Sequence, residues 1–342
     1  MTRAKRAWEL AGPALLVVAV AMIGTLTSSS LQFQFRSVLV TASIVVALHV
    51  FVGNSGVISF GHVSFVALGA FAAGVATAPA DVKPIAFPAL FPFLTELQLS
   101  NVESLLLAAG LGGVYAFLVG LPIVRLSGLS AGIATFALLI ITNNVFRNWE
   151  RIGPGAKTLT QIPETTGFLQ ATVGLLIAMA VAFVYQQSRQ ARMLRASRED
   201  PAAAQSSGVD IHRQRLLAFT LSGALAAFAG GLLVHLLGTI TTQQVFLDLT
   251  FITLAMLVVG GVGSLWGAVL GSLLIAGLNS VLAEAERGIR LLSLDIDLPD
   301  GTRLVALGVT MALVLLFKPS GLTGGRELTW PLVRRSKISS GR

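Results

Sequence analysis

Long apolar runs alternate with short polar segments along most of the chain. Most runs approach the ~20 residues that a helix needs to cross the hydrocarbon core of a bilayer. The pattern therefore predicts an all-α, polytopic transmembrane helix bundle that forms a single domain over residues 1–342. We expect about ten spans, at 8–27, 37–53, 60–79, 101–122, 128–146, 168–185, 214–236, 247–262, 265–283 and 302–317.

Two parts of this pattern depart from regular spanning helices. Residues 80–100 carry several prolines, which break a helix because proline lacks an amide hydrogen. We expect an outer loop or a re-entrant turn there. The first run follows the basic segment MTRAKR, as in a secretory signal peptide. That run is long and leads into TSSS without a cleavage site of small residues, so we interpret it as an uncleaved helix.

Composition and charge agree with a membrane protein. Charged residues make up 12% of the chain, about half of their share in an ordinary soluble domain. The net charge of +8 does not indicate nucleic-acid binding, because about two-thirds of the 24 basic residues flank the spans on one side. Basic residues concentrate on the cytoplasmic side of membrane proteins. We therefore predict that the N-terminus and the C-terminus are both cytoplasmic.

A polar segment at about 53–64 interrupts the apolar pattern. The stretch GNSGVISFGHVSFVALGA contains glycines, serines, an asparagine and a histidine, but no charge and no proline. Glycine permits a broken helix or a close backbone approach, and non-helical backbone at membrane depth must be buried in protein or face a watery cavity. Its polar side chains either line a translocation pathway or hold helices together. The candidates are Asn54, Ser55, Ser59, Gly61, His62 and Ser64.

Small residues four positions apart predict two closely packed helix faces. Gly112, Ala116 and Gly120 form one in the fourth span, and Gly263, Gly267 and Gly271 form the other in the ninth. Such faces let helix backbones approach closely within a membrane. They indicate a compact bundle and do not by themselves indicate transport.

Ionisable groups are rare in the spans. Glu103 and Asp248 lie near span ends, and the middles of the ten spans contain no carboxylate. Carriers that are driven by ions or protons usually keep such groups at mid-membrane, so we expect the energy source on another subunit. The alternatives are an ion- or proton-coupled secondary transporter of small polar solutes and, least favoured, an intramembrane enzyme. The chain has no cysteine, and its histidines show no paired metal-binding spacing, so we predict no catalytic residue, metal or cofactor.

The polar loop at about 186–213 is the other informative segment. Arginines recur every three residues from Arg189 to Arg198, followed by Glu199, Asp200 and Pro201. Acidic residues and proline suit the first turn of a helix, and glycine suits its end. We predict a short surface helix at about 200–207 that ends before Gly208. It either docks another protein or belongs to a basic loop that binds anionic membrane lipid.

Three segments, in order, resemble the permeases of branched-chain amino acid ABC transporters, the LivM-type family. GNSGVISFGHVSFVALGAFAAG resembles the family's "GQxSLGHAAFxxxGAY" signature. REDPAAAQSSGVDIHRQRLLAFTLSGALAAFAGGL and MLVVGGVGSLWGAVLGSLL resemble two further elements. The resemblance covers most of residues 36–320. Asn54 stands where the family usually has glutamine, and Pro201 stands where the loop's acidic residue would align, which leaves the substrate open between branched-chain amino acids, other amino acids, amides and urea.

The resemblance implies an importer subunit in the bacterial cytoplasmic (inner) membrane. An extracytoplasmic substrate-binding protein would deliver the substrate, a second permease subunit would complete the pathway, and two ATP-binding subunits would drive alternating access. The residues expected to couple the chain to ATP hydrolysis are Arg198, Glu199, Asp200, Ala203 and Gly208.

Overall fold

The computed structural model describes residues 3–153, 155–286, 289–291, 294–296, 299 and 301–327. The fold is a helix bundle with one short β-hairpin, which the apolar pattern did not predict. The helices are α1 (Arg3–Thr25), α2 (Ser29–Ser55), α3 (His62–Thr77), α4 (Lys83–Ala86), α5 (Pro92–Glu96), α6 (Asn101–Ile123), α7 (Gly128–Asn148), α8 (Phe168–Gln187), α9 (Arg189–Glu199), α10 (Pro201–Ser206), α11 (Ile211–Leu237), α12 (Leu247–Gly260), α13 (Leu265–Glu286) and α14 (Thr302–Phe317). Strands β1 (Ile289–Leu291) and β2 (Leu294–Ile296) pair in antiparallel register.

Seven of the described helices are long and apolar enough to cross a membrane: α1, α2, α6, α7, α8, α11 and α13. Each coincides with one of the predicted spans. The other three predicted spans fall on α3, α12 and α14, which have 16, 14 and 16 residues. These three are shorter than the ~20 residues of a full crossing. The stretch 80–100 contains only the short helices α4 and α5, in agreement with its prolines.

The centre of the bundle is formed by α2, α3 and α11. In the most apolar 18-residue stretch of each helix, 78% of the residues of α2 and 72% of those of α11 are buried. The corresponding share is 33% in α1 and in α6. Outer helices instead expose large apolar side chains such as Leu106, Leu129 and Leu169. Apolar residues on the outside are expected where lipid replaces water as the solvent. The chain is thus a multi-pass membrane protein with a protein-packed centre.

The two charged residues near span ends have local structural roles. Glu103 completes a capping box at the start of α6, where its carboxylate accepts a hydrogen bond of 2.8 Å from the Ser100 amide. Asp248 lies in the first turn of α12. A negative charge at a helix N-terminus is favourable because it opposes the positive end of the helix dipole.

The small face of α6 packs directly against α11. A Cβ atom at Gly112 would overlap the side chain of Ala227, and one at Gly223 would overlap Ala116. At Gly120 an added Cβ would lie 2.8 Å from Leu216. The two backbones therefore approach as closely as these small residues permit.

The second small face brings α13 against α12. A Cβ at Gly267 would lie 2.8 Å from the Gly260 carbonyl, and one at Gly271 would overlap the carbonyl of Met256. The prediction was wrong for Gly263, which precedes α13 in the turn between the two helices. There it lies against the Gly325 carbonyl, because the C-terminal segment 318–327 folds back beneath this turn.

Leucine at Gly112 is expected to destabilise the bundle. The added side chain must enter the contact between α6 and α11, and overpacking of this kind costs about 1–3 kcal/mol. Gly110 offers a matched control in the same helix, because a Cβ there meets no atom of another described element within 4 Å. Thermal unfolding in detergent should show a lower midpoint for Gly112→Leu and an unchanged one for Gly110→Leu. Equal midpoints for the two variants would contradict the close packing.

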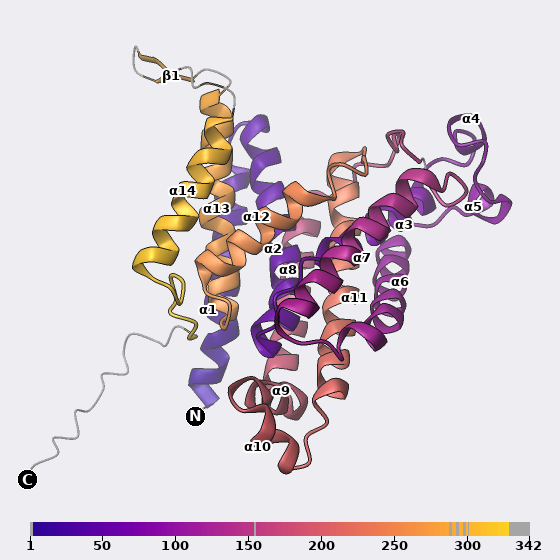
Figure 1. Cartoon of the computed structure of the whole chain (residues 1–342). Coiled ribbons are helices and arrows are strands. Elements are labelled where there is room, and N and C mark those ends of the chain that lie inside the picture. The colour runs from indigo at the N-terminus through magenta and orange to yellow at the C-terminus, as the bar shows by residue number, and fades with distance from the viewer. Residues whose placement is uncertain are drawn as a thin grey trace, which may run out of the picture.

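The two ends of the bundle differ in character (Figure 1). The start of α1 and the helices α9 and α10 lie at one end, here called the α9–α10 end. Helices α4 and α5 and strand β1 lie at the opposite end. The polar break between α2 and α3 lies toward the α9–α10 end. The polar segment at about 53–64 and the arginine-rich loop at about 186–213 therefore contact each other.

Candidate functional site

The chain turns sharply between α2 and α3. Helix α2 ends at Ser55 because Gly56 adopts a left-handed conformation, with φ of +71°, and its amide donates to the Val52 carbonyl. An L side chain at this φ would be strained, and a Cβ would also lie 2.9 Å from Arg198. At Gly61 a Cβ would overlap the backbone of Thr135 in α7. Both glycines are therefore required for the turn to fit between α7 and α9.

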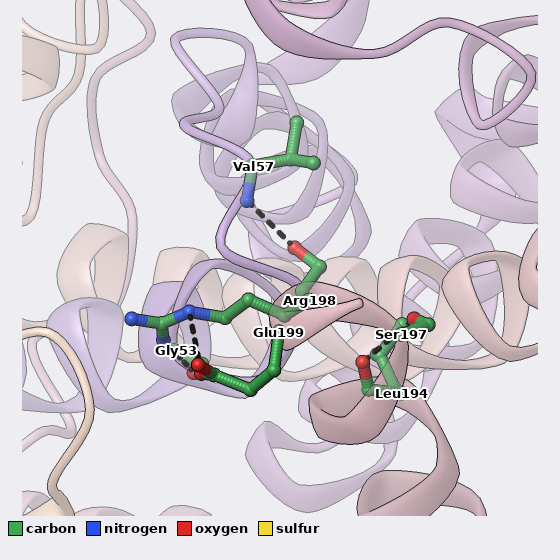
Figure 2. Close-up of polar contacts among 7 residues, drawn as sticks. Gly53, Val57, Leu194, Ser197, Arg198 and Glu199 are labelled. Carbon is green, nitrogen blue, oxygen red and sulfur yellow. Dashed lines mark hydrogen bonds and ion pairs between the residues drawn. The ribbon is translucent and has the colours of Figure 1, made fainter. Parts of the chain in front are cut away.

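The polar side chains of this segment are buried within the protein. Asn54, Ser55, Ser59, His62 and Ser64 are each at most 5% exposed. Asn54 donates to the Val50 carbonyl at 2.9 Å, and the Ser55 hydroxyl accepts from the Val57 amide at 3.1 Å (Figure 2). Both contacts shape the last turn of α2.

Three buried polar atoms at the start of α3 lack partners. Ser222 donates its hydroxyl proton to the Ala47 carbonyl, so its oxygen accepts from Nδ1 of His62 at 3.4 Å. His62 Nε2 has no hydrogen-bond partner in the described part of the chain, and neither does the hydroxyl of Ser59 or of Ser64. A buried polar group without a partner costs about 1–3 kcal/mol.

Arginines of α9 hold the last turn of α2. Arg195 donates from Nη1 to Oδ1 of Asn54 at 2.6 Å and from Nη2 to the Gln186 carbonyl at 2.9 Å. Arg198 donates to the Gly53 carbonyl at 3.3 Å (Figure 2). The C-terminal turn of a helix carries unpaired carbonyls and the negative end of the helix dipole. The two guanidinium groups are therefore well placed to stabilise the end of α2.

Arg195 was not among the residues predicted from the sequence to take part in coupling. Burial lowers the pKa of Arg195, yet a guanidinium remains protonated in proteins. The charge is therefore kept in a half-buried position between α2, α8 and α9.

The helix predicted at about 200–207 is confirmed as α10. Asp200 caps it by accepting from the Ala203 amide at 3.0 Å, and Pro201 occupies its first position. Gly208 follows with φ of +80° and open space around its α-carbon. The Glu199 side chain is 81% exposed and pairs with Arg198 at 3.9 Å, a surface contact worth little. Ala203 is also exposed, so α10 presents a free surface while α9 is fixed to the bundle.

A carboxylate from the C-terminal segment extends this contact network. Glu327 accepts from the amides of Leu265 at 2.7 Å and Trp266 at 3.2 Å, and from the side chains of Ser264 and Gln186. It thereby caps the N-terminus of α13 and joins it to the end of α8. Gln186 joins the two sets of contacts. Its side-chain amide donates to Glu327, and its backbone carbonyl accepts from Arg195. Neither residue was singled out from the sequence.

A cavity of about 420 Å³ lies between the end of α2, the start of α10 and α12. Its floor is mostly aliphatic, and Arg198 and Arg215 contribute its basic groups. Of the candidate pathway residues, Ser55 lines it. Among the described residues, no three His, Asp or Glu side chains come together as a metal site would require.

Comparison with known proteins gives consistent matches. A family described as "Branched-chain amino acid transport system / permease component" matches residues 30–315. The chain is similar to the high-affinity branched-chain amino acid transport system permease protein LivM of Salmonella typhimurium, with 26% identity over 90% of this chain and 73% of that protein. LivM of Escherichia coli is equally similar. The autoinducer 2 import system permease protein LsrC of an Enterobacter species is 29% identical over 52% of this chain and 55% of that protein.

Proposed function

The chain belongs to the family of permease components of branched-chain amino acid transport systems, and from this premise we propose how it moves its substrate. It is a permease subunit of an ABC importer. The family consists of transport components, and ATP hydrolysis resides on a separate subunit. We propose that two ATP-binding subunits dock at the α9–α10 end, and that a second permease subunit and an extracytoplasmic substrate-binding protein complete the importer.

The proposed location is the bacterial inner membrane, with about ten spans and both termini in the cytoplasm. The basic residues of the loops support this orientation. The arrangement of the helices supports it too, because the start of α1 lies at the α9–α10 end (Figure 1). In this orientation the ATP-binding subunits and the exposed surface of α10 share one compartment.

The contact between α9 and α2 is the observation that supports the mechanism most directly. We propose that α10 receives the motion of the ATP-binding subunit and that α9 transmits it through Arg195 and Arg198 to the last turn of α2. Glu199, Asp200, Ala203 and Gly208 shape and present the docking surface. The cavity beside Ser55 leaves room for the turn at 56–58 to move. Such a switch between two packed states is how ABC importers alternate access, with the ATP cycle shifting the populations.

The pathway is proposed to pass beside the start of α3. The partnerless polar atoms of Ser59, His62 and Ser64 support this, because a polar solute or water would satisfy them in another state of the bundle. Asn54, Ser55 and Gly61 belong to the same turn. We propose a branched-chain or other amino acid as the substrate, in keeping with the named substrates of the LivM relatives. The binding protein would select among the candidates.

Glutamate at Ala203 is expected to abolish ATP-dependent uptake while leaving membrane insertion normal. The new charge would lie on the exposed face of α10, where the ATP-binding subunit docks, and burying an unpaired charge in an interface is strongly unfavourable. Co-purification of the ATP-binding subunit with the tagged chain measures docking directly. The matched control is Ala196→Glu on an exposed position of α9, which should dock and transport normally. Normal uptake by Ala203→Glu, or ion-driven transport by the chain alone in liposomes, would refute the proposal.

A further inference from the structure

A groove of about 960 Å³ runs along α11 between α6 and α8. Its walls are made of large apolar side chains, among them Phe117, Val184, Leu217 and Leu221. Val184 and Leu217 are 69% and 43% exposed, so the groove opens toward the outside of the described bundle. It is separate from the break between α2 and α3 and from the exposed surface of α10.

Polar groups gather at one end of this groove. Arg213, Gln190 and Ser188 lie there, at the junction of α8 with α9 and at the start of α11. The Arg213 guanidinium makes no hydrogen bond or ion pair with any residue that the structure describes. Its backbone amide donates to Oδ1 of Asp210 at 3.0 Å, and Asp210 thereby caps the N-terminus of α11.

The length of the groove matches one leaflet of a bilayer. Its lining residues on α11 run from Arg213 to Ala224, a distance of ~16 Å at 1.5 Å per residue. Half of a hydrocarbon core of about 30 Å is ~15 Å. The groove is basic at the membrane surface and apolar toward the midplane, which is the polarity of a phospholipid.

We propose that this groove binds a phospholipid with an anionic headgroup from the leaflet on the α9–α10 side. One acyl chain lies along α11, and the phosphate lies beside Arg213. A helix of another subunit fits less well, because helices that pack in membranes meet through small residues, whereas Phe, Leu and Val form this surface. The site goes beyond the transport function and requires only that the chain lies in a membrane.

Native mass spectrometry of the purified full-length chain tests the proposal. The protein is titrated with phosphatidylglycerol and with phosphatidylcholine of identical acyl chains. We expect about fivefold tighter binding of phosphatidylglycerol, the factor that corresponds to ~1 kcal/mol per basic residue near a membrane surface. Arg213→Gln should abolish this preference. Leu217→Trp, which fills the groove, should weaken the binding of both lipids.

The control is Arg192→Gln, which removes an exposed arginine of α9 that does not line the groove. It should keep the full preference. Equal affinity of the unaltered chain for both lipids would overturn the proposal, and so would an equal loss in Arg192→Gln, which would indicate diffuse attraction. Because the chain has no cysteine, Val184→Cys can be cross-linked selectively in membranes. Cross-linking to a second permease subunit would show that protein, not lipid, occupies the groove.

Discussion

Replacing Arg195 with glutamine is expected to lower ATP-dependent uptake by about ten- to a hundredfold. The substitution removes the charged donor that joins α9 to Asn54 of α2 and to the Gln186 carbonyl of α8. A hydrogen bond to a charged group is worth about 1.5–3 kcal/mol. The ATP-binding subunit should still dock, because α10 is unchanged. Uptake into vesicles and co-purification of that subunit, measured on the same membranes, separate transmission from docking.

Arg192 supplies the control for this prediction, because it is an exposed arginine one turn away on the same helix. Arg192→Gln should transport normally. Asn54→Ala should reproduce part of the loss, and the double variant with Arg195→Gln should be little worse than Arg195→Gln alone, since residues in direct contact are not additive. Fully additive losses, or an equal defect in Arg192→Gln, would show that Arg195 does not act through α2.

Replacing Glu327 with alanine is expected to lower the free energy of unfolding more than any other substitution described above. The change leaves the amides of Leu265 and Trp266 without their acceptor at the start of α13 and frees Gln186. Loss of a helix cap costs about 0.5–2 kcal/mol, and unpaired buried groups add to it, for a total of about 3 kcal/mol. The midpoint of thermal unfolding in detergent is the measurement.

Two further variants make the Glu327 prediction specific. Glu327→Gln keeps an oxygen acceptor without the charge and should be intermediate. Glu199→Ala removes a carboxylate that is 81% exposed and should leave the midpoint unchanged. If Glu327→Ala unfolds at the same temperature as the unaltered chain, the carboxylate does not cap α13.

Local signals in the sequence were sufficient for much of the fold. Runs without charge located the long helices, since a helix in lipid must be apolar along its length. The pair Asp200 and Pro201, with Gly208 after it, located α10, because helix caps act within a few residues. Glu103 and Asp248 lie in the first turns of their helices, as their places near span ends suggested.

Contacts between distant segments were not accessible in the same way. Glu327 accepts a hydrogen bond from the Leu265 amide only because the C-terminal segment folds back under the turn between α12 and α13. No local sequence pattern predicts that this segment folds back. The same fold places Gly263 outside α13. Hydropathy also did not distinguish α3, which is surrounded by protein, from helices that face lipid. The inward direction of Arg195 depends on where α9 packs against α2 and α8, which its spacing along the sequence does not predict.

The cap on α13 also has a consequence for the order in which the protein matures. Chains are synthesised from the N-terminus, so α12 and α13 emerge before residue 327 exists. Until then the first amides of α13 lack their carboxylate acceptor, and Gln186 at the end of α8 lacks its hydrogen bond to Glu327. The start of α13 therefore acquires its cap only after residue 327 has been synthesised. Truncation before Glu327 would leave α12 and α13 in place but without the carboxylate that joins α13 to the end of α8.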